Sequence, residues 1–554
     1  MATLLIYFVP MVTFLINPWN SYDGINVPKL SMLVVSAAIL AALLVLDLRL
    51  VIESRYRATV IFSGLFKIAL WVSLLAHPNP FNEHFFGTYG RNTGFLAYLS
   101  LLIIFFVAVV SLDKKTSEKL VWSLLSIGGL SIIYGLFQSF KLDPFKWNNP
   151  YSPVLGFLGN PDFQSSLLGI CGVAAVALFF SPKASLKFRT GLGLYLLLTG
   201  YVIARTKAQQ GFLVFLAGSA IVLFVLLHKT QSTQKLSFIY LPLLLASGVL
   251  VVMGSLNKGP LAHALYKASV TYRGDYWRAA WKMTTSHPFT GVGLDSYGNW
   301  YRQTRDLAAT LRRGPEIASN AAHNVFLDMS SNGGFPLLIA YLLIVGYALF
   351  SAIKVIRRSA GFDPVLSALF GAWFAYQLQS SISINQIGLA VWGWALSGAL
   401  IAYEISTREV AESVKAPITK GRMGKSRSQE RAISATSVIA ICLGAVVGLA
   451  LALPPYLADA GLRSALRSGF TTNLEIAVKK WPLDETRLFY GAQLLYTSKL
   501  QAKALAMSEF TANRDPRFYY AWKEISANSA ATPAQKSEAL AHMKALDPHN
   551  PNLK

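Results

Sequence analysis

The chain is 554 residues long, and 53% of these residues are hydrophobic while only 14% are charged. A soluble protein of this length carries more charge, so the composition excludes that class and favours a membrane protein. In a soluble protein the formal net charge of +23 would indicate a nucleic-acid partner. Here most basic residues lie in short segments between apolar runs, which indicates membrane topology and no nucleic-acid partner.

Repeated apolar runs of roughly 16–20 residues predict an all-α, polytopic membrane protein with about 12–13 transmembrane helices. The predicted spans are 2–16, 30–46, 59–76, 94–112, 120–138, 165–180, 190–204, 211–227, 236–253, 334–353, 364–383, 388–403 and 433–453. The first run lacks a basic start and a small-residue cleavage site, so we interpret it as a retained span and not as a signal peptide.

These spans divide the chain into six parts. The predicted parts are nine spans in 1–253, a large extracytoplasmic loop in 254–333, three spans in 334–403, a basic cytoplasmic linker in 404–432, a last span in 433–453 and a small C-terminal helical-repeat domain in 456–554. Lys and Arg are concentrated in every second connection between spans. Because basic connections stay in the cytoplasm, we expect a cytoplasmic N-terminus, with the long loop and the tail outside the bacterial cytoplasmic membrane.

The C-terminal domain shows a proline period. Pro482, Pro516 and Pro548 recur at spacings of roughly 34 and 32 residues, near the tetratricopeptide period. About two such repeats are few for a free-standing solenoid, so we expect them to pack on the membrane domain or on a partner protein. An ordinary helical hairpin tail is the alternative interpretation.

The long loop carries an arginine on an unusual helix face. If 270–284 is a helix, a polar, solvated face carries Asp275, Arg278 and Lys282, and the opposite face carries Trp277, Ala280, Trp281 and Thr284. Arg273 lies in the middle of this second face. An arginine among aromatic residues is costly unless it meets an anion or lines a polar cavity. The alternative is a guanidinium that stacks on Trp277 and reaches the lipid interface.

His323 is the candidate base in the same loop. It follows Ser319-Asn320-Ala321-Ala322, a predicted helix start, and precedes a break at Gly333-Gly334. With an ordinary pKa near 6.5, histidine is a neutral base at working pH, although a lone loop histidine is more often structural or solvated. The sequence has no paired metal-ligand spacing, Walker loop, GxSxG elbow or dinucleotide fingerprint, so no metal or other cofactor is predicted.

Several motifs of this chain resemble a known family. Arg273-x-x-x-Trp277, and His323 with nine residues between it and Gly333, are similar to motifs of the bacterial O-antigen ligase and O-antigen polymerase superfamily. Supporting segments are 323–338, 287–293, 86–94 and 159–162. The resemblance covers roughly residues 4 to 403, and some members of the superfamily carry tetratricopeptide-like tails.

The resemblance implies a membrane glycosyltransferase. Such an enzyme transfers a glycan from an undecaprenyl-diphosphate donor to an acceptor hydroxyl outside the cytoplasmic membrane, without a metal. It implies that His323 is the catalytic base and that Arg273 and a second cation bind the diphosphate. Before the eighth span the chain departs from the family pattern, so Arg205 is the candidate for the second cation, with Lys207 as its alternative. Arg91 is a further secondary candidate.

Other functions remain open at this point. Within the class, the acceptor is a lipid A core, a growing glycan or a protein side chain, as in a protein O-oligosaccharyltransferase. A flippase or transporter for lipid-linked oligosaccharides is the alternative from another class. Transporters place polar groups on broken helices at the bilayer midplane, whereas the candidate cations here lie mainly in the outer loop. A scaffold whose repeats recruit a protein partner is a third, weaker alternative.

Overall fold

A computed structural model of the chain describes residues 1–147, 152–415 and 434–553, with the side chains of 409–415 left out. Within these ranges all regular elements are helices. The predicted fold class, an all-α polytopic membrane protein, is therefore confirmed. Most of the predicted basic linker, from residue 416 onward, lies outside the described residues.

Each of the thirteen predicted spans coincides with a helix. Nine helices of the described chain are long and apolar enough to cross a membrane: α2 (Asn26–Val45), α4 (Arg57–Ala76), α7 (Lys114–Ser139), α8 (Pro161–Phe179), α10 (Gln210–Lys229), α11 (Gln234–Ser255), α16 (Val325–Arg358), α18 (Ile387–Lys415) and α19 (Ala435–Ser468). The other four are α1 (Ala2–Phe14), α6 (Phe95–Ser111), α9 (Leu186–Thr206) and α17 (Pro364–Ser380). How many of them cross the bilayer stays a prediction.

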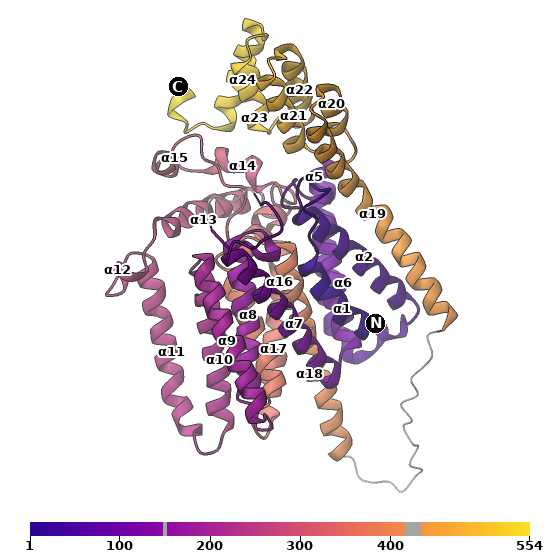
Figure 1. Cartoon of the computed structure of the whole chain (residues 1–554), viewed down its shortest axis with the longest axis vertical. Helices are drawn as coiled ribbons and strands as arrows, with labels where there is room; N and C mark the ends of the chain where they lie inside the picture. The colour runs from indigo at the N-terminus through magenta and orange to yellow at the C-terminus, as the bar shows by residue number, and fades with distance from the viewer. Residues whose placement is uncertain (148–151, 416–433, 554) are drawn as a thin grey trace.

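The helices form an upright bundle with a clear centre (Figure 1). Helix α18 is buried along its whole apolar stretch, and α8 is buried along most of its length. Helix α11 lies at one edge with nearly all of its side chains exposed, and α19 lies at the opposite side. An apolar helix with an exposed outer surface is expected where lipid is the neighbour.

The long loop and the C-terminal helices lie together above one end of this bundle, which we call the platform end (Figure 1). The segments 15–25 and 87–94 belong to the same end, because the first bonds to α19 beyond its two prolines and the second bonds to the residue that caps α21 (Glu485–Thr497). Tyr22 N and Asp23 N donate to the Asp459 carboxylate at 2.8 and 2.9 Å, and Tyr89 N donates to Asp484 at 3.0 Å. The platform end therefore gathers polar segments from the whole chain.

The helix of the last predicted span continues beyond the predicted end of that span. Helix α19 runs without interruption past Pro454-Pro455, whereas the predicted span stops at residue 453. A proline inside a helix removes one backbone hydrogen bond and crowds the carbonyl of residue i−4, and the Asp459 contacts hold the turns beyond the two prolines in place. The composition changes at these prolines while the backbone stays helical, so the end of the span stays a prediction.

Five helices follow α19 and form the C-terminal tail. They are α20 (Thr471–Val478), α21 (Glu485–Thr497), α22 (Gln501–Arg514), α23 (Tyr519–Ala527) and α24 (Pro533–Leu546). Pro482, Pro516 and Pro548 lie in the turns that precede or follow these helices, as expected from their spacing. The assignment of the tail to tetratricopeptide repeats stays a prediction.

Two glycines bring α19 close to α2. A Cβ atom added at Gly444 would lie 2.7 Å from the Ile39 Cα, and one added at Gly448 would lie 2.7 Å from the Val35 Cα. Two glycines four residues apart form one smooth helix face, which lets two membrane helices approach each other closely. The contact anchors the helix that carries the tail.

We predict that Gly444→Leu separates α19 from α2, because the added side chain overlaps backbone atoms. Overpacking of this kind costs about 1–3 kcal/mol, so the variant should melt at a lower temperature in detergent than the wild type. Val446→Leu is the control, since Val446 lies between the two glycines and is 65% exposed. Equal melting of the two variants would show that the glycine contact does not stabilise the bundle.

Candidate active site

The long loop is a folded unit with its own helices. It contains α12 (Ala262–Leu265), α13 (Ala268–Ser286), α14 (Tyr297–Thr304) and α15 (Leu307–Arg313). Its small core includes Tyr276, Met283, Val292, Tyr297 and Tyr301. The predicted helix over 270–284 is confirmed as part of α13. The loop is therefore a structured platform on which single side chains hold fixed positions.

The predicted helix start at Ser319 to Ala322 is wrong. Helix α16 begins at Val325, and the Asn324 side chain accepts hydrogen bonds from Phe326 N at 3.0 Å and Leu327 N at 3.1 Å. Asparagine is a strong N-cap because its side-chain oxygen bonds the free N–H groups of the first turn. The cap places His323 immediately outside the helix.

The predicted break in α16 is confirmed, and it meets a second family-like motif. Gly334 has φ +69°, and a Cβ atom there would lie 2.5 Å from the Pro288 carbonyl oxygen. Phe335 N donates to Pro288 O, and Val292 N donates to Ser331 O, both at 2.8 Å. The segment 287–293 thus packs on the kink, which only a residue without a side chain permits. This packing fixes the kink of α16 that follows its first turns.

His323 has a left-handed backbone conformation with φ 53°. Its imidazole is half-buried and stacks on the Tyr276 ring, with the ring centroids 5.4 Å apart. Burial, followed by the nearby Arg273, Arg91 and Arg313 guanidinium groups, lowers the pKa of His323 to about 4. The imidazole is therefore neutral at physiological pH, with three positive charges around it.

Arg273 is the cation of this set with the fewest partners. It is half-buried on α13, and it makes no hydrogen bond, ion pair or ring contact with another described residue. Burial lowers the pKa of the guanidinium, and the carboxylate of Asp162, at the start of α8, opposes this shift. No stacking on Trp277 is seen among the described contacts. Arg273 is thus placed to bind an anion from outside the chain.

Arg313 was missed in the sequence. It ends α15, and its guanidinium donates to the Tyr276 hydroxyl and lies 4.6 Å from the centroid of the Tyr272 ring. Both tyrosines belong to α13, so Arg313 joins the group around His323 by folding back over this helix. In the sequence, the basic pair Arg312-Arg313 could have suggested a further cation of the site. The pair lies far from residue 273 in the chain, so nothing in the sequence joined the two.

The solvated face predicted for α13 is wrong at Asp275. This carboxylate is only 2% exposed and pairs with Arg278 and Arg312. Helix α15 covers it, which a helical wheel of α13 alone does not contain. The Arg312 pairing holds α15 against α13 and so helps to place Arg313.

Arg91 is fixed by a buried carboxylate. Its Nη2 lies 3.2 Å from Asp295 Oδ1, and its Nη1 donates to the Asn320 carbonyl. Asp295 also accepts Thr88 N at 2.8 Å, Thr93 N at 3.2 Å and Thr93 Oγ1 at 2.9 Å. Although burial opposes the charged form, Asp295 and other nearby groups raise the pKa of Arg91. The secondary candidate Arg91 therefore joins Arg273 and Arg313 near His323, and we call these three arginines the cation group.

Arg205 and Lys207 lie at the end of α9. Both are exposed, and Arg205 Nε donates to Ser139 Oγ at 2.9 Å. Lys207 terminates the helix with φ 60°. None of the described contacts joins either residue to Arg273 or His323. The choice between them as a diphosphate ligand stays a prediction.

The tail docks on the platform through aspartates in its turns. Asp547 is fully buried and accepts Arg302 Nη1 at 3.1 Å and Arg305 Nη2 at 2.7 Å, both from the segment of α14 (Figure 1). Asp515 accepts Asn299 Nδ2 at 2.9 Å. As predicted, the helices of the tail pack on the membrane domain and are not a free arm.

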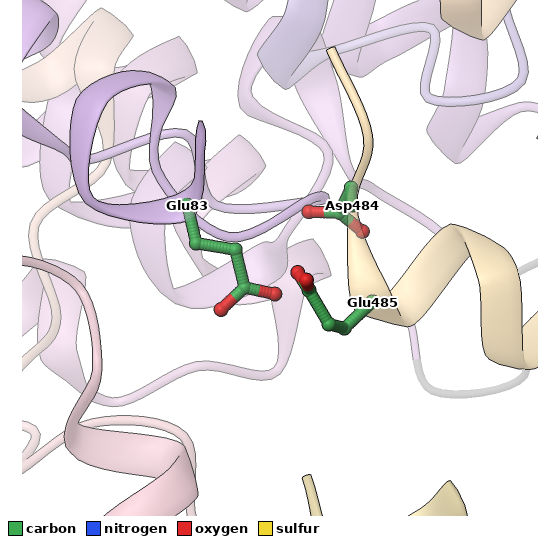
Figure 2. Close-up of side chains that lie close together, drawn as sticks. All are labelled: Glu83, Asp484 and Glu485. Carbon is green, nitrogen blue, oxygen red and sulfur yellow. The ribbon is translucent and has the colours of Figure 1, made fainter. Parts of the chain in front are cut away.

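A cluster of three buried carboxyl groups lies in the same interface (Figure 2). Glu83 of α5 (Phe81–Phe86), Asp484 and Glu485 place one oxygen each within 4.8 Å of the others. Asp484 accepts Tyr89 N and Arg487 N, and Glu485 Oε1 accepts Arg514 Nε at 2.6 Å. Glu83 Oε1 and Glu485 Oε2 are the oxygens of these groups without a described partner.

This cluster is a poor candidate for a metal site. Burial and the adjacent Glu485 raise the pKa of Glu83 well above its ordinary value. This shift favours the protonated form of Glu83, which lowers the repulsion between it and the tail carboxylates. A protonated carboxyl group is a poor ligand, because metal ions bind the carboxylate form.

A family model matches the part of the sequence that contains the long loop. The model of the O-antigen ligase family matches residues 194–342. The match supports an O-antigen ligase/polymerase family for this chain, and with it an O-antigen ligase-type glycosyltransferase in general. The matched segment contains Arg205, Lys207, Arg273, Arg313 and His323. No curated protein matches the chain.

We predict that Asp547→Asn loosens the far end of the tail. The change leaves two buried guanidinium groups without their counter-charge, which costs about 3–5 kcal/mol. Protease cleavage and hydrogen exchange should increase in α24 and its flanking turns. Lys523→Met is the control, because its ion pair with Glu316 is about half exposed and contributes about 0–1 kcal/mol. Equal protection of α24 in both variants would contradict the docking role of Asp547.

Proposed function

We propose that the protein transfers a glycan from an undecaprenyl-diphosphate donor to an acceptor hydroxyl outside the cytoplasmic membrane. One observation carries this proposal: a neutral histidine lies among three guanidinium groups, of which Arg273 has no described partner. Paired guanidinium groups match the geometry and charge of a diphosphate. The basic connections between spans support the side of the membrane that we assign to the platform end.

In the proposed reaction, Arg273 and Arg313 bind the diphosphate of the donor. The proton of the acceptor hydroxyl passes to a ring nitrogen of His323. The acceptor oxygen bonds to the anomeric carbon as the bond from this carbon to the diphosphate oxygen breaks. The electron pair of that bond leaves with undecaprenyl diphosphate, whose growing negative charge the guanidinium groups stabilise. Attack from the face opposite to the leaving group inverts the anomeric centre.

Because positive charges surround His323, its strength as a base should depend on whether the donor is bound. In the free enzyme burial and, after it, three cations disfavour the imidazolium and hold the pKa of His323 at about 4. A bound diphosphate would offset the charge of these cations, so the pKa of His323 would rise by the part of the shift that the cations cause. The histidine therefore becomes a stronger base only when the donor is in place.

The guanidinium groups take the charge-stabilising role that a divalent metal has in other glycosyltransferases, so we propose a metal-independent enzyme without a cofactor. Arg205 or Lys207 is a further candidate for the diphosphate. The acceptor remains a lipid A core, a growing glycan or a protein side chain. A ladder of product lengths without added acceptor would identify a polymerase, and a single addition would identify a ligase.

We predict that His323→Ala abolishes transfer in proteoliposomes with a lipid-linked donor, while the melting temperature is retained. Loss of a general base lowers the rate about 10²–10⁴-fold. His263→Ala is the control, because His263 is an exposed histidine of the same loop. Wild-type transfer should also persist in EDTA. Normal transfer by His323→Ala would reject the mechanism, and loss of transfer in EDTA would reject metal independence.

We predict an unusual pH dependence. The acidic side of the kcat/KM profile reports His323 in the free enzyme, so kcat/KM should fall near pH 4. The acidic side of the kcat profile reports the donor complex, so kcat should fall at a higher pH. Arg313→Gln removes one positive charge, so it should raise the free-enzyme limb toward the ordinary histidine value. Lys282→Gln is the matched control, since Lys282 is an exposed cation of α13 and is not among the groups that shift the pKa of His323. An unshifted limb in Arg313→Gln would exclude the coupling.

A further inference from the structure

An open groove lies on the tail, next to the platform. Its volume is about 470 Å³, within the range of about 300–1,000 Å³ typical of ligand pockets. Helix α21 supplies Tyr490, Gln493, Leu494, Tyr496 and Thr497, α23 supplies Glu524, and the segment 15–25 supplies Tyr22. Tyr22 is 44% exposed, so the wall that faces the bundle is accessible.

The lining has a distinct chemistry. Three tyrosine rings provide apolar faces with polar ends, and an amide, a hydroxyl and a carboxylate provide hydrogen-bond donors and acceptors. Gln493 hydrogen-bonds to Glu524, which keeps both polar groups at the groove. The lining contains one aliphatic side chain and no cation, which disfavours both an apolar helix and a polyanion as the occupant.

A sugar chain fits this combination. Each pyranose ring has a face of C–H groups that packs on an aromatic ring, and an edge of hydroxyl groups that bonds to amides and carboxylates. The rings of Tyr22 and Tyr490 lie 6.3 Å apart at 57°, so they form an angled wall and not a closed stack. Rigid tyrosine side chains lose little conformational entropy on binding.

One short segment of the chain contacts the groove and also carries Arg91 of the cation group. The Tyr22 ring stacks on Tyr89, with centroids 6.5 Å apart and planes at 19°, and Tyr89 lies two residues before Arg91. Tyr89 N donates to Asp484, the N-cap of α21, so one short segment touches both sites. A glycan held in the groove would therefore lie beside the segment that carries Arg91.

We propose that this groove binds an uncharged stretch of glycan, several sugars away from the reacting carbon. The contribution of the groove to transfer rests on the proposed function, whereas the binding of glycan to the groove does not. The groove would hold a long chain at the platform end, so that its reactive end stays near His323. An acceptor polypeptide as the occupant is the competing outcome.

The test uses the full-length protein in nanodiscs. The probe is glycan released by mild acid from the lipid-linked pool of the expressing cells and fractionated by length, with binding measured by calorimetry. We expect Tyr490→Ala/Gln493→Ala to weaken binding at least about tenfold. Phe510→Ala is the control, because Phe510 is an exposed aromatic residue of α22 outside the groove. His323→Ala should bind the fragments like the wild type.

The outcomes separate this proposal from the proposed function. Unchanged binding in the double variant, or wild-type binding that is absent for all glycan fragments, overturns the groove as a glycan site. Binding of an acceptor polypeptide that is lost in the double variant, with no glycan binding, also overturns it. Transfer by His323→Ala would reject the catalytic mechanism but leave the binding result intact. If both proposals hold, the double variant raises KM for long donors and leaves kcat nearly unchanged.

Discussion

The Asp295 carboxylate is the interaction on which the candidate site depends. It receives two backbone N–H groups, the Thr93 hydroxyl and the Arg91 guanidinium, so it ties the segment 87–94 to the long loop. A buried carboxyl group with several donors holds each of them in place. Without it, the segment 87–94 would lose its attachment to the long loop, and Arg91 would no longer be held near His323.

The arginines of the platform end have two different roles. Carboxylates in the turns of the tail neutralise arginines that have a structural role, as Asp547 does for Arg302 and Arg305. Arg273 forms no ion pair or hydrogen bond with a described residue, which is why we propose it as a ligand-binding arginine. The contrast between paired and unpaired arginines separates the candidate binding residues from the docking residues, although both kinds are half-buried or buried and lie in the same loop. Burial alone would not distinguish them.

The sequence predicted what depends on local pattern and missed what depends on contacts between distant segments. Apolar periodicity identified the helices and the break at Gly334 was predicted, while the family-like motifs selected His323 and Arg273, which lie near each other in the structure. Arg313 was missed because only the folding of α15 over α13 brings it to Tyr276. Asp275 was placed on a solvated face for the same reason, since its cover comes from another helix. The change of composition at Pro454-Pro455 does not interrupt α19, so it did not indicate where the helix ends.

The length of α19 limits how far the tail can lie from the lipid. Its 34 residues form one helix, and at a rise of 1.5 Å per residue this corresponds to about 51 Å. The hydrocarbon core of a bilayer is about 30 Å thick, so an α19 that crosses the bilayer as predicted would extend up to about 20 Å into the aqueous phase, together with the helices it carries (Figure 1). Such a projection would extend beyond the lipid headgroups. Molecules that meet the tail would then approach it from water, whereas the platform beneath it would face the membrane surface.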